Sequence, residues 1–217
     1  MVSGCSKWSS GTTTVEFVII NPANGEPFPN VNVKIVEETS TNKASGGVIS
    51  EGKTDASGRI TFEFTAKRTS KYWYTPVIDT DYFGPYENWE YLIRPKVSSY
   101  AIIKNVYNEM RYEITFYAYL RDEIKNINCE GIGDTLFFHR KYLELNKGTK
   151  VYDNRTVHAG CYEYETVSID GNPVGHRKVF MGTHIYNYEV HRLSGVTFGS
   201  DTIYLNKGEL GTLQAFY

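Results

Sequence analysis

Five histidines are the residues of this chain whose type best suits metal or proton-transfer chemistry. Neighbouring histidines stand seven or more positions apart, at His139, His158, His176, His184 and His191. Structural metal sites commonly draw their ligands from short, regular spacings, and none of these histidines has such a neighbour. On a regular strand, His184 and His191 would face opposite sides, because successive side chains alternate. The sequence therefore predicts no metal and no cofactor, with assembly of a site from distant segments left open.

The sequence supports catalysis by a nucleophile or by paired carboxylates no better than it supports metal chemistry. The chain contains no Gly-x-Ser-x-Gly motif, and none of its cysteines stands in a known nucleophile context. Glu163 and Glu165 lie two residues apart, so they share a face of the strand predicted there. Paired carboxylates can serve glycoside hydrolysis, but on an alternating strand they more often form the solvated face. We therefore predict a protein that is not an enzyme and keep a metal-dependent enzyme as an alternative.

The aromatic-rich stretch over residues 71–91 is the candidate binding site. Flat aromatic faces stack on sugar rings and anchor protein contacts, while Asp79 and Asp81 between them could bind hydroxyl groups. The expected ligand is a glycan or a protein partner. Aromatic side chains also fill the cores of sandwiches, so burial of the same residues is the alternative. The predicted ligand-binding residues are Trp73, Tyr74, Tyr82, Tyr86 and Trp89.

Strands are expected to position all of these side chains. Hydrophobic residues alternate over residues 15–20, 31–35 and 60–64, and the pattern restarts over residues 112–117 and 161–169. No apolar pattern of helical period persists for three turns, and aromatic residues make up 15% of the chain, which favours a pleated, half-buried surface. The predicted fold class is all-β, with two β-sandwich domains at residues 13–104 and 105–217.

Composition limits the classes of partner. The chain has 217 residues and a formal net charge of −2, so it carries no basic surplus to neutralise phosphates. Binding to nucleic acid is therefore not expected. No apolar run approaches the roughly 18 residues that a membrane-spanning helix needs. The oligomeric state is left open by the sequence.

The segment Val2-Ser3-Gly4-Cys5 resembles the end of a bacterial lipoprotein signal, in which small residues precede the cysteine that receives the lipid. The resemblance implies lipidation of Cys5, a signal trimmed off upstream, and a tether over residues 1–12 that is rich in Ser, Thr and Gly. It implies an exported, cell-envelope protein, an outer-membrane lipoprotein held at the membrane only by its lipid. The alternative is an ordinary thiol on a terminal segment.

The cysteine count favours a disulfide in the second half of the chain. Of the three cysteines, lipidation of Cys5 would leave Cys129 and Cys161 as an even pair. An oxidising compartment would make a bridge between them the expected state. Two buried free thiols are the alternative.

The first half of the chain resembles a known sandwich family. The run Gly25-x-Pro27-x-Pro29-Asn-Val31-x-Val33, followed by Thr54-Asp-x-x-Gly58-x-Ile60-x-Phe62, is similar to the transthyretin-like and carboxypeptidase regulatory-like families and to the B-type repeats of Gram-positive adhesins. The resemblance covers residues about 13–95 and implies a transthyretin-like β-sandwich. It says almost nothing about activity. The second half, around residues 116–134, resembles the carboxyl domains of Bacteroidota surface lipoproteins of unassigned role.

Together these observations predict a non-catalytic lipoprotein that binds a glycan or a protein partner at the cell surface. Its first sandwich would act as a spacer, and its second would carry contacts. A structural adhesin or assembly subunit that pairs through strand edges is the alternative. A metal-dependent enzyme on a transthyretin-like sandwich is the second alternative.

Overall fold

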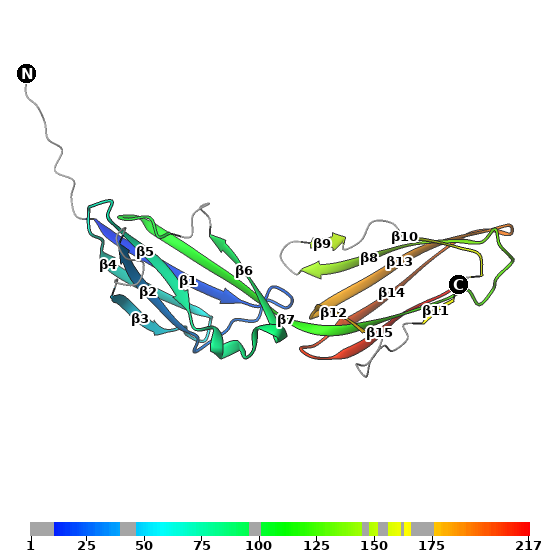
Figure 1. Cartoon of the computed structure of the whole chain (residues 1–217), viewed down its shortest axis with the longest axis horizontal. Coiled ribbons are helices and arrows are strands. Elements are labelled where there is room, and N and C mark those ends of the chain that lie inside the picture. Colours follow the sequence, from blue (N-terminus) through cyan, green and yellow to red (C-terminus); the bar gives the residue numbers. More distant parts are fainter. Residues whose placement is uncertain are drawn as a thin grey trace, which may run out of the picture. The chain divides into compact units, whose positions relative to one another are not determined.

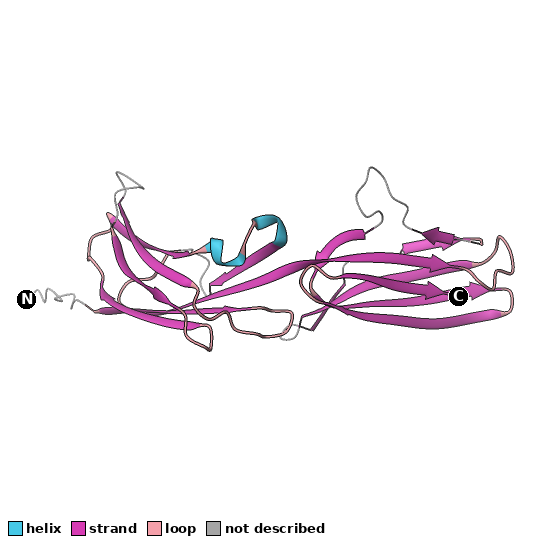
Figure 2. Cartoon of the chain, turned by 90° about the horizontal axis from the view of Figure 1, so that it is seen from below, coloured by secondary structure: helices cyan, strands magenta, loops and turns pink. Residues whose placement is uncertain are grey.

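The computed structural model describes residues 11–39, 47–95, 101–144, 148–151, 156–161, 163–165 and 176–217 (Figure 1). The described chain is all-β, as predicted: strands dominate it, and its helical structure consists of the short 3-10 turns η1 (Thr80–Phe83) and η2 (Tyr86–Asn88) (Figure 2). None of the helices in this part is both long enough and apolar enough to cross a membrane. The strands are β1 (Thr12–Ile20), β2 (Asn32–Thr39), β3 (Val48–Lys53), β4 (Arg59–Thr65), β5 (Tyr72–Ile78), β6 (Trp89–Pro95), β7 (Tyr107–Lys125), β8 (Thr135–Glu144), β9 (Gly148–Val151), β10 (Thr156–Ala159), β11 (Glu163–Glu165), β12 (His176–Phe180), β13 (Gly182–Arg192), β14 (Gly195–Leu205) and β15 (Leu210–Phe216).

The described residues divide into two compact units, which we call unit 1 and unit 2. The division falls within β7, between Ile114 and Thr115, whereas the sequence placed it between residues 104 and 105. The alternating pattern of β7 crosses this point without a Gly or a Pro, so no local signal marks it. Of the described residues, unit 1 holds those up to Asn21, Glu26–Tyr86 and Tyr91–Ile114, and unit 2 holds Pro22–Gly25, Glu87–Glu90 and those from Thr115 onward.

Unit 1 is a β-sandwich. One sheet contains β4, β1 and the first part of β7, and the other is three-stranded in the order β3-β2-β5. β1 pairs antiparallel with β4 and parallel with β7. Val15, Phe17 and Ile19 of β1 are buried, as their alternation predicted. Phe64 of β4 contacts Tyr74 of β5, with 4.8 Å between ring centroids, so aromatic side chains fill the space between the two sheets.

A tight turn before β4 follows directly from its residue types. Asp55 Oδ1 accepts hydrogen bonds from the backbone N–H groups of Ser57 at 2.8 Å and Arg59 at 3.0 Å. Gly58 has φ +70°, in the left-handed region that favours glycine. A Cβ at Gly58 would lie 2.4 Å from the carbonyl oxygen of Ile19, so the turn also needs the missing side chain. The predicted turn at residues 54–58 is thus confirmed.

Unit 2 is a second β-sandwich. The rest of β7 pairs with β11, β12 and β15 in one sheet, and the other sheet runs β10-β8-β13-β14, with β9 also paired to β8. Leu120 of β7, Tyr186 of β13 and Leu213 of β15 are buried in one cluster, and Ile124 and Val190 in a neighbouring one. Full burial of an aliphatic side chain stabilises the fold by about 1.5–3 kcal/mol. These side chains come from both sheets, so they hold the two layers together.

Candidate functional site

Two of the five predicted ligand-binding aromatics lie in the interior. Tyr74 and Trp89 are only 1% and 2% exposed. The Tyr74 hydroxyl donates to Glu37 Oε2 at 3.1 Å and accepts from the backbone N–H of Lys67 at 2.9 Å, so its polar end is already used. Burial is the main cause that raises the pKa of Tyr74 above its ordinary value. Both side chains are therefore buried, which is the alternative that the sequence left open for these aromatics, since inward positions on strands stabilise large aromatic side chains. A ligand role for either residue stays a prediction.

The other three predicted aromatics belong to unit 1 and reach solvent. Tyr82 and Tyr86 are 45% and 65% exposed. Trp73 is half-buried, and its indole N–H donates to Glu38 Oε2 at 2.7 Å. Near them, Asp79 lines a polar hollow of about 340 Å³ at the start of η1. A ligand role for these three aromatics stays a prediction.

The histidines do not gather into one place. Within the described ranges, no group of three His, Cys, Asp or Glu side chains is arranged to hold a metal ion. His184 is buried, with Nε2 2.8 Å from the carbonyl oxygen of Phe180, and burial lowers its pKa. His158 stacks on Phe138 at 5.4 Å, and burial lowers its pKa as well.

Some sequence predictions fall outside the described residues. Cys5 and residues 1–10 of the tether predicted over residues 1–12 are among these, as is the end of the strand predicted over residues 161–169. Glu163 and Glu165 do form a described strand, β11, which pairs antiparallel with β7.

A cavity in unit 2, which we call the cationic cavity, was not found from the sequence. It has a volume of about 270 Å³. Its lining residues come from four separate parts of the chain, so no short motif could reveal them. The only sequence signals were the pairs Arg140-Lys141 and Arg177-Lys178, which are typical of solvated strand positions. The cavity is lined by Glu90, Tyr117, Leu120, Arg140, Lys141, Arg177, Lys178, Val179, Phe180, His184 and Tyr186.

One internal carboxylate organises the arginines of the cationic cavity. Asp122 Oδ2 accepts from Arg140 Nη1 at 3.2 Å, and Asp122 Oδ1 accepts from Arg177 Nη2 at 3.0 Å. The Tyr186 hydroxyl donates to Asp122 and accepts from Arg177 Nη2 at 2.7 Å. The Asp122 side chain is 14% exposed, so these charge-assisted bonds are weakly screened. They hold both guanidinium groups in fixed positions.

A lysine and a tyrosine form another wall of the cavity. Lys178 Nζ lies 3.9 Å from the centroid of the Tyr117 ring and donates to the carbonyl oxygen of Glu87. The Tyr117 hydroxyl donates to Glu90 Oε2 at 2.7 Å. The single histidine among the lining residues, His184, directs Nε2 to a backbone carbonyl rather than to a nucleophile. This arrangement suits binding of a polar ligand more than proton transfer.

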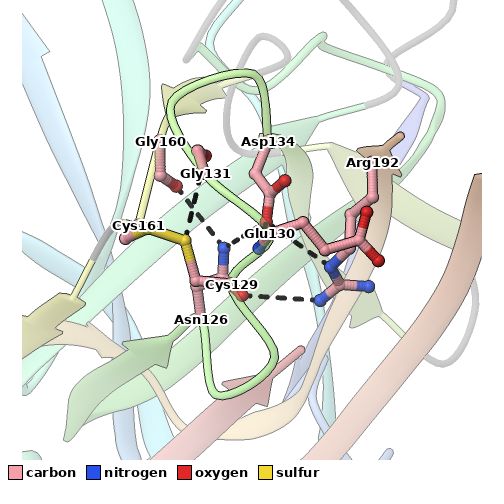
Figure 3. Close-up of a disulfide and its surroundings, with 8 residues drawn as sticks. All are labelled: Asn126, Cys129, Glu130, Gly131, Asp134, Gly160, Cys161 and Arg192. Carbon is pink, nitrogen blue, oxygen red and sulfur yellow. Dashed lines mark hydrogen bonds and ion pairs between the residues drawn. A yellow bond between two sulfur atoms is a disulfide. The ribbon is translucent and has the colours of Figure 1, made fainter. Parts of the chain in front are cut away.

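The predicted disulfide is present at another part of unit 2. Cys129 and Cys161 are bonded, with their Cα atoms 5.3 Å apart, within the normal range for a bridge (Figure 3). Neighbouring loops are joined by further bonds, because Glu130 Oε2 accepts from the backbone N–H of Ser194 at 3.0 Å. The bridge fixes the loop that precedes β8 to the segment just after β10, and the Glu130 bond fixes the same loop to the turn between β13 and β14.

Beside the disulfide, Asp134 is almost fully buried (Figure 3). Its Oδ2 accepts from Asn126 Nδ2 at 2.9 Å and from the backbone N–H of Glu130 at 3.0 Å, and it pairs with Arg192 Nε at 3.5 Å. The hydrogen bond from Asn126 is the main cause that lowers the pKa of Asp134. A carboxylate satisfied in this way is a structural clamp, since its oxygen is occupied by the protein itself.

Comparison with known proteins gives no family for the chain. No protein-family model matches it, and no curated protein matches it. Among solved structures, the TIE protein of Bacillus anthracis is 14% identical, with a TM-score of 0.33; the match covers 95% of this chain and 34% of that one. The shaft pilin SpaA of Lactobacillus rhamnosus GG is 10% identical, with a TM-score of 0.30, and 94% and 97% of the two chains are covered. GBS52, the minor pilin of Streptococcus agalactiae, is 12% identical, with a TM-score of 0.30 and 94% of each chain covered. Likenesses this distant do not extend a function to this protein.

Proposed function

We propose that this protein is a non-catalytic contact protein of the cell envelope, which binds a partner through the cationic cavity of unit 2. The observation that carries the proposal is a cavity lined by Arg140, Arg177 and Lys178, in which one internal carboxylate, Asp122, holds the two arginines and the carbonyl oxygen of Glu87 holds Lys178. Cations that are already fixed by neighbours lose little side-chain freedom when a ligand arrives. The cavity is thus organised before binding.

Placement at the cell envelope is supported by the chemistry of the cysteines. A disulfide between Cys129 and Cys161 suits an oxidising compartment. The Val2-Ser3-Gly4-Cys5 segment supports a lipid anchor on Cys5. For unit 1 we keep the transthyretin-like assignment of residues about 13–95, supported by the turn at Asp55 and Gly58, with a role as a spacer. A relationship of unit 2 to Bacteroidota surface lipoproteins belongs to the same proposal.

Binding of the purified chain to isolated cell-envelope material tests the contact role, because this material holds both surface glycans and surface proteins. We expect saturable binding that weakens by about tenfold for Lys178→Gln, equivalent to about 1.4 kcal/mol. The matched control is Lys207→Gln: Lys207 Nζ also lies 3.9 Å from an aromatic centroid, that of Phe116, but it does not line the cavity. Absent saturable binding, or equal loss in both variants, would refute the proposal.

The lipid anchor has its own test. Mass spectrometry of the chain recovered from its own host is expected to show an acylated Cys5, and Cys5→Ala is expected to release the protein from the membrane fraction. An unmodified Cys5 in membrane-bound protein would contradict the assignment.

A second candidate function is that of an assembly subunit that pairs through strand edges. The pairing, exposure and composition of β14 favour it. Among the described strands, β14 pairs only with β13. Val196 and Phe198 on it are 48% and 76% exposed, and β14 contains no Lys, Arg or Pro. Long apolar edges without such residues are templates for another strand. Self-association measured by light scattering that disappears in Phe198→Lys would support this function, and a monomer at high concentration would exclude pairing between copies.

A further inference from the structure

The cationic cavity carries more positive charge than its own carboxylates neutralise. Four cationic side chains line it: Arg140, Lys141, Arg177 and Lys178. Among the described residues that line or contact the cavity, the carboxylates are Glu90 and Asp122, so four positive charges against two negative charges leave a surplus of two. Lys178 bonds to a neutral acceptor, the carbonyl of Glu87, which leaves its charge in place. The cavity is therefore complementary to an anionic group.

Arg177 also retains a donor with no acceptor. Its Nη2 is bonded to Asp122 and to the Tyr186 hydroxyl, but its Nε is buried and has no hydrogen-bond partner within the described structure. A buried donor without an acceptor raises the free energy of the folded protein, because it has lost its hydrogen bonds to water and has formed none within the protein. A ligand oxygen that reached Nε would remove this cost. A carboxylate has the right geometry, since guanidinium and carboxylate groups match.

The cavity runs along an edge of β12 that none of the described strands pairs with. Among the described strands, β12 pairs only with β7. Four consecutive residues of β12, from Arg177 to Phe180, line the cavity. Successive side chains of a strand point to opposite faces, so a cavity that touches all four lies along the strand's edge. Such an edge presents backbone N–H and C=O groups that can pair with an incoming extended segment.

We propose that the ligand of the cationic cavity is an acidic peptide segment that adds to the open edge of β12 and places a carboxylate between Arg177 and Lys178. The proposal rests on the function proposed above and names its partner. Backbone pairing along β12 supplies affinity, and the carboxylate supplies selectivity. Tyr117, Leu120 and Phe180 in the lining accommodate the apolar part of the acidic residue or of its neighbour.

Binding of the full-length protein to an array of short synthetic peptides, each with a central Glu, tests the acidic-peptide proposal. Every peptide has a partner in which Gln replaces that Glu, and an oligogalacturonate serves as a carboxylate of different origin. We expect the Glu peptides to bind about tenfold more tightly than their Gln partners. This preference is expected to disappear in Lys178→Gln and to remain in Lys207→Gln. In a nitrogen–proton NMR spectrum, the Nε–H signal of Arg177 is expected to shift downfield with the Glu peptide, and Arg177→Lys is expected to remove the signal and weaken binding.

The outcomes separate this inference from the proposed function. Equal binding of Glu and Gln peptides, or an unchanged Arg177 Nε–H signal, overturns the peptide assignment. Binding of the oligogalacturonate alone, with the same dependence on Lys178, also overturns it but leaves a cavity that binds a glycan. If neither probe binds while envelope material still binds through Lys178, only the ligand class is wrong. If envelope binding is lost as well, the proposed function fails.

Discussion

Replacing Gly58 with alanine is expected to weaken unit 1 for two separable reasons. First, φ at Gly58 is +70°, and a residue with a Cβ in the left-handed region costs about 1–2 kcal/mol. Second, the new Cβ would lie 2.4 Å from the Ile19 carbonyl oxygen, which already accepts from the backbone N–H of Phe28 at 3.0 Å. The strand must move, and the bond from Ile19 N–H to Gly58 O, 2.9 Å long, is expected to break. A backbone hydrogen bond contributes about 1 kcal/mol, so the total loss in the free energy of unfolding is about 2–3 kcal/mol.

Gly208 provides a matched control in unit 2. It has the same φ of +70°, but a Cβ there meets nothing within 4 Å. Gly208→Ala is therefore expected to cost only the backbone contribution, about 1–2 kcal/mol. Hydrogen exchange of the amides in each unit measures the two losses separately, which avoids treating two units as one transition. Equal losses in the two variants, or a loss below about 0.5 kcal/mol for Gly58→Ala, would refute the steric reasoning.

Three further changes have defined outcomes in unit 2. Reduction, or the double change Cys129→Ser and Cys161→Ser, opens a link of sequence separation 32 and is expected to lower the free energy of unfolding by about 3–4 kcal/mol in denaturant experiments. Burial lowers the pKa of His184 in the folded protein below its ordinary value of 6.5. The unfolded chain therefore takes up a proton at this histidine more readily, so the contribution of His184 to stability is present above pH 6.5 and is lost as the pH falls below 6.5. In His184→Gln, the free energy of unfolding is expected to fall less steeply between pH 7 and pH 5 than in the unchanged protein. Asp122→Asn removes the charged acceptor shared by the two arginines of the cavity. It is expected to destabilise unit 2 by roughly 2 kcal/mol and, because the guanidinium groups lose their fixed positions, to weaken binding of a Glu peptide.

Each of these expectations has a result that contradicts it. Equal unfolding midpoints with and without reductant would mean that the disulfide constrains little in the unfolded chain. His158 also has a lowered pKa, so His158→Gln serves as the comparison for His184→Gln. An unchanged pH slope in both variants would assign the loss to other groups. Tighter peptide binding by a folded Asp122→Asn protein would show that Asp122 competes with the ligand for the arginines rather than positioning them for it.

The sequence by itself determined the class of fold and several local features. Side chains alternate along a strand, so the inward positions of Val15, Phe17 and Ile19 could be inferred from hydrophobicity alone. The turn at Gly58 and the pairing of Cys129 with Cys161 followed from residue type and count. These features depend on interactions between near neighbours, or on a choice among very few partners.

Only the tertiary structure decided which aromatics are exposed and where a ligand could bind. Tyr74 and Trp89 have the same residue types as their exposed neighbours but are buried, and Tyr74 packs on Phe64 of another strand, β4. The cationic cavity joins Tyr117, Arg140 and Arg177 from three strands that the sequence keeps apart, and β1 pairs in parallel with a strand that begins more than eighty residues later. Contacts of this kind arise from the pairing of whole strands, which a local pattern does not encode.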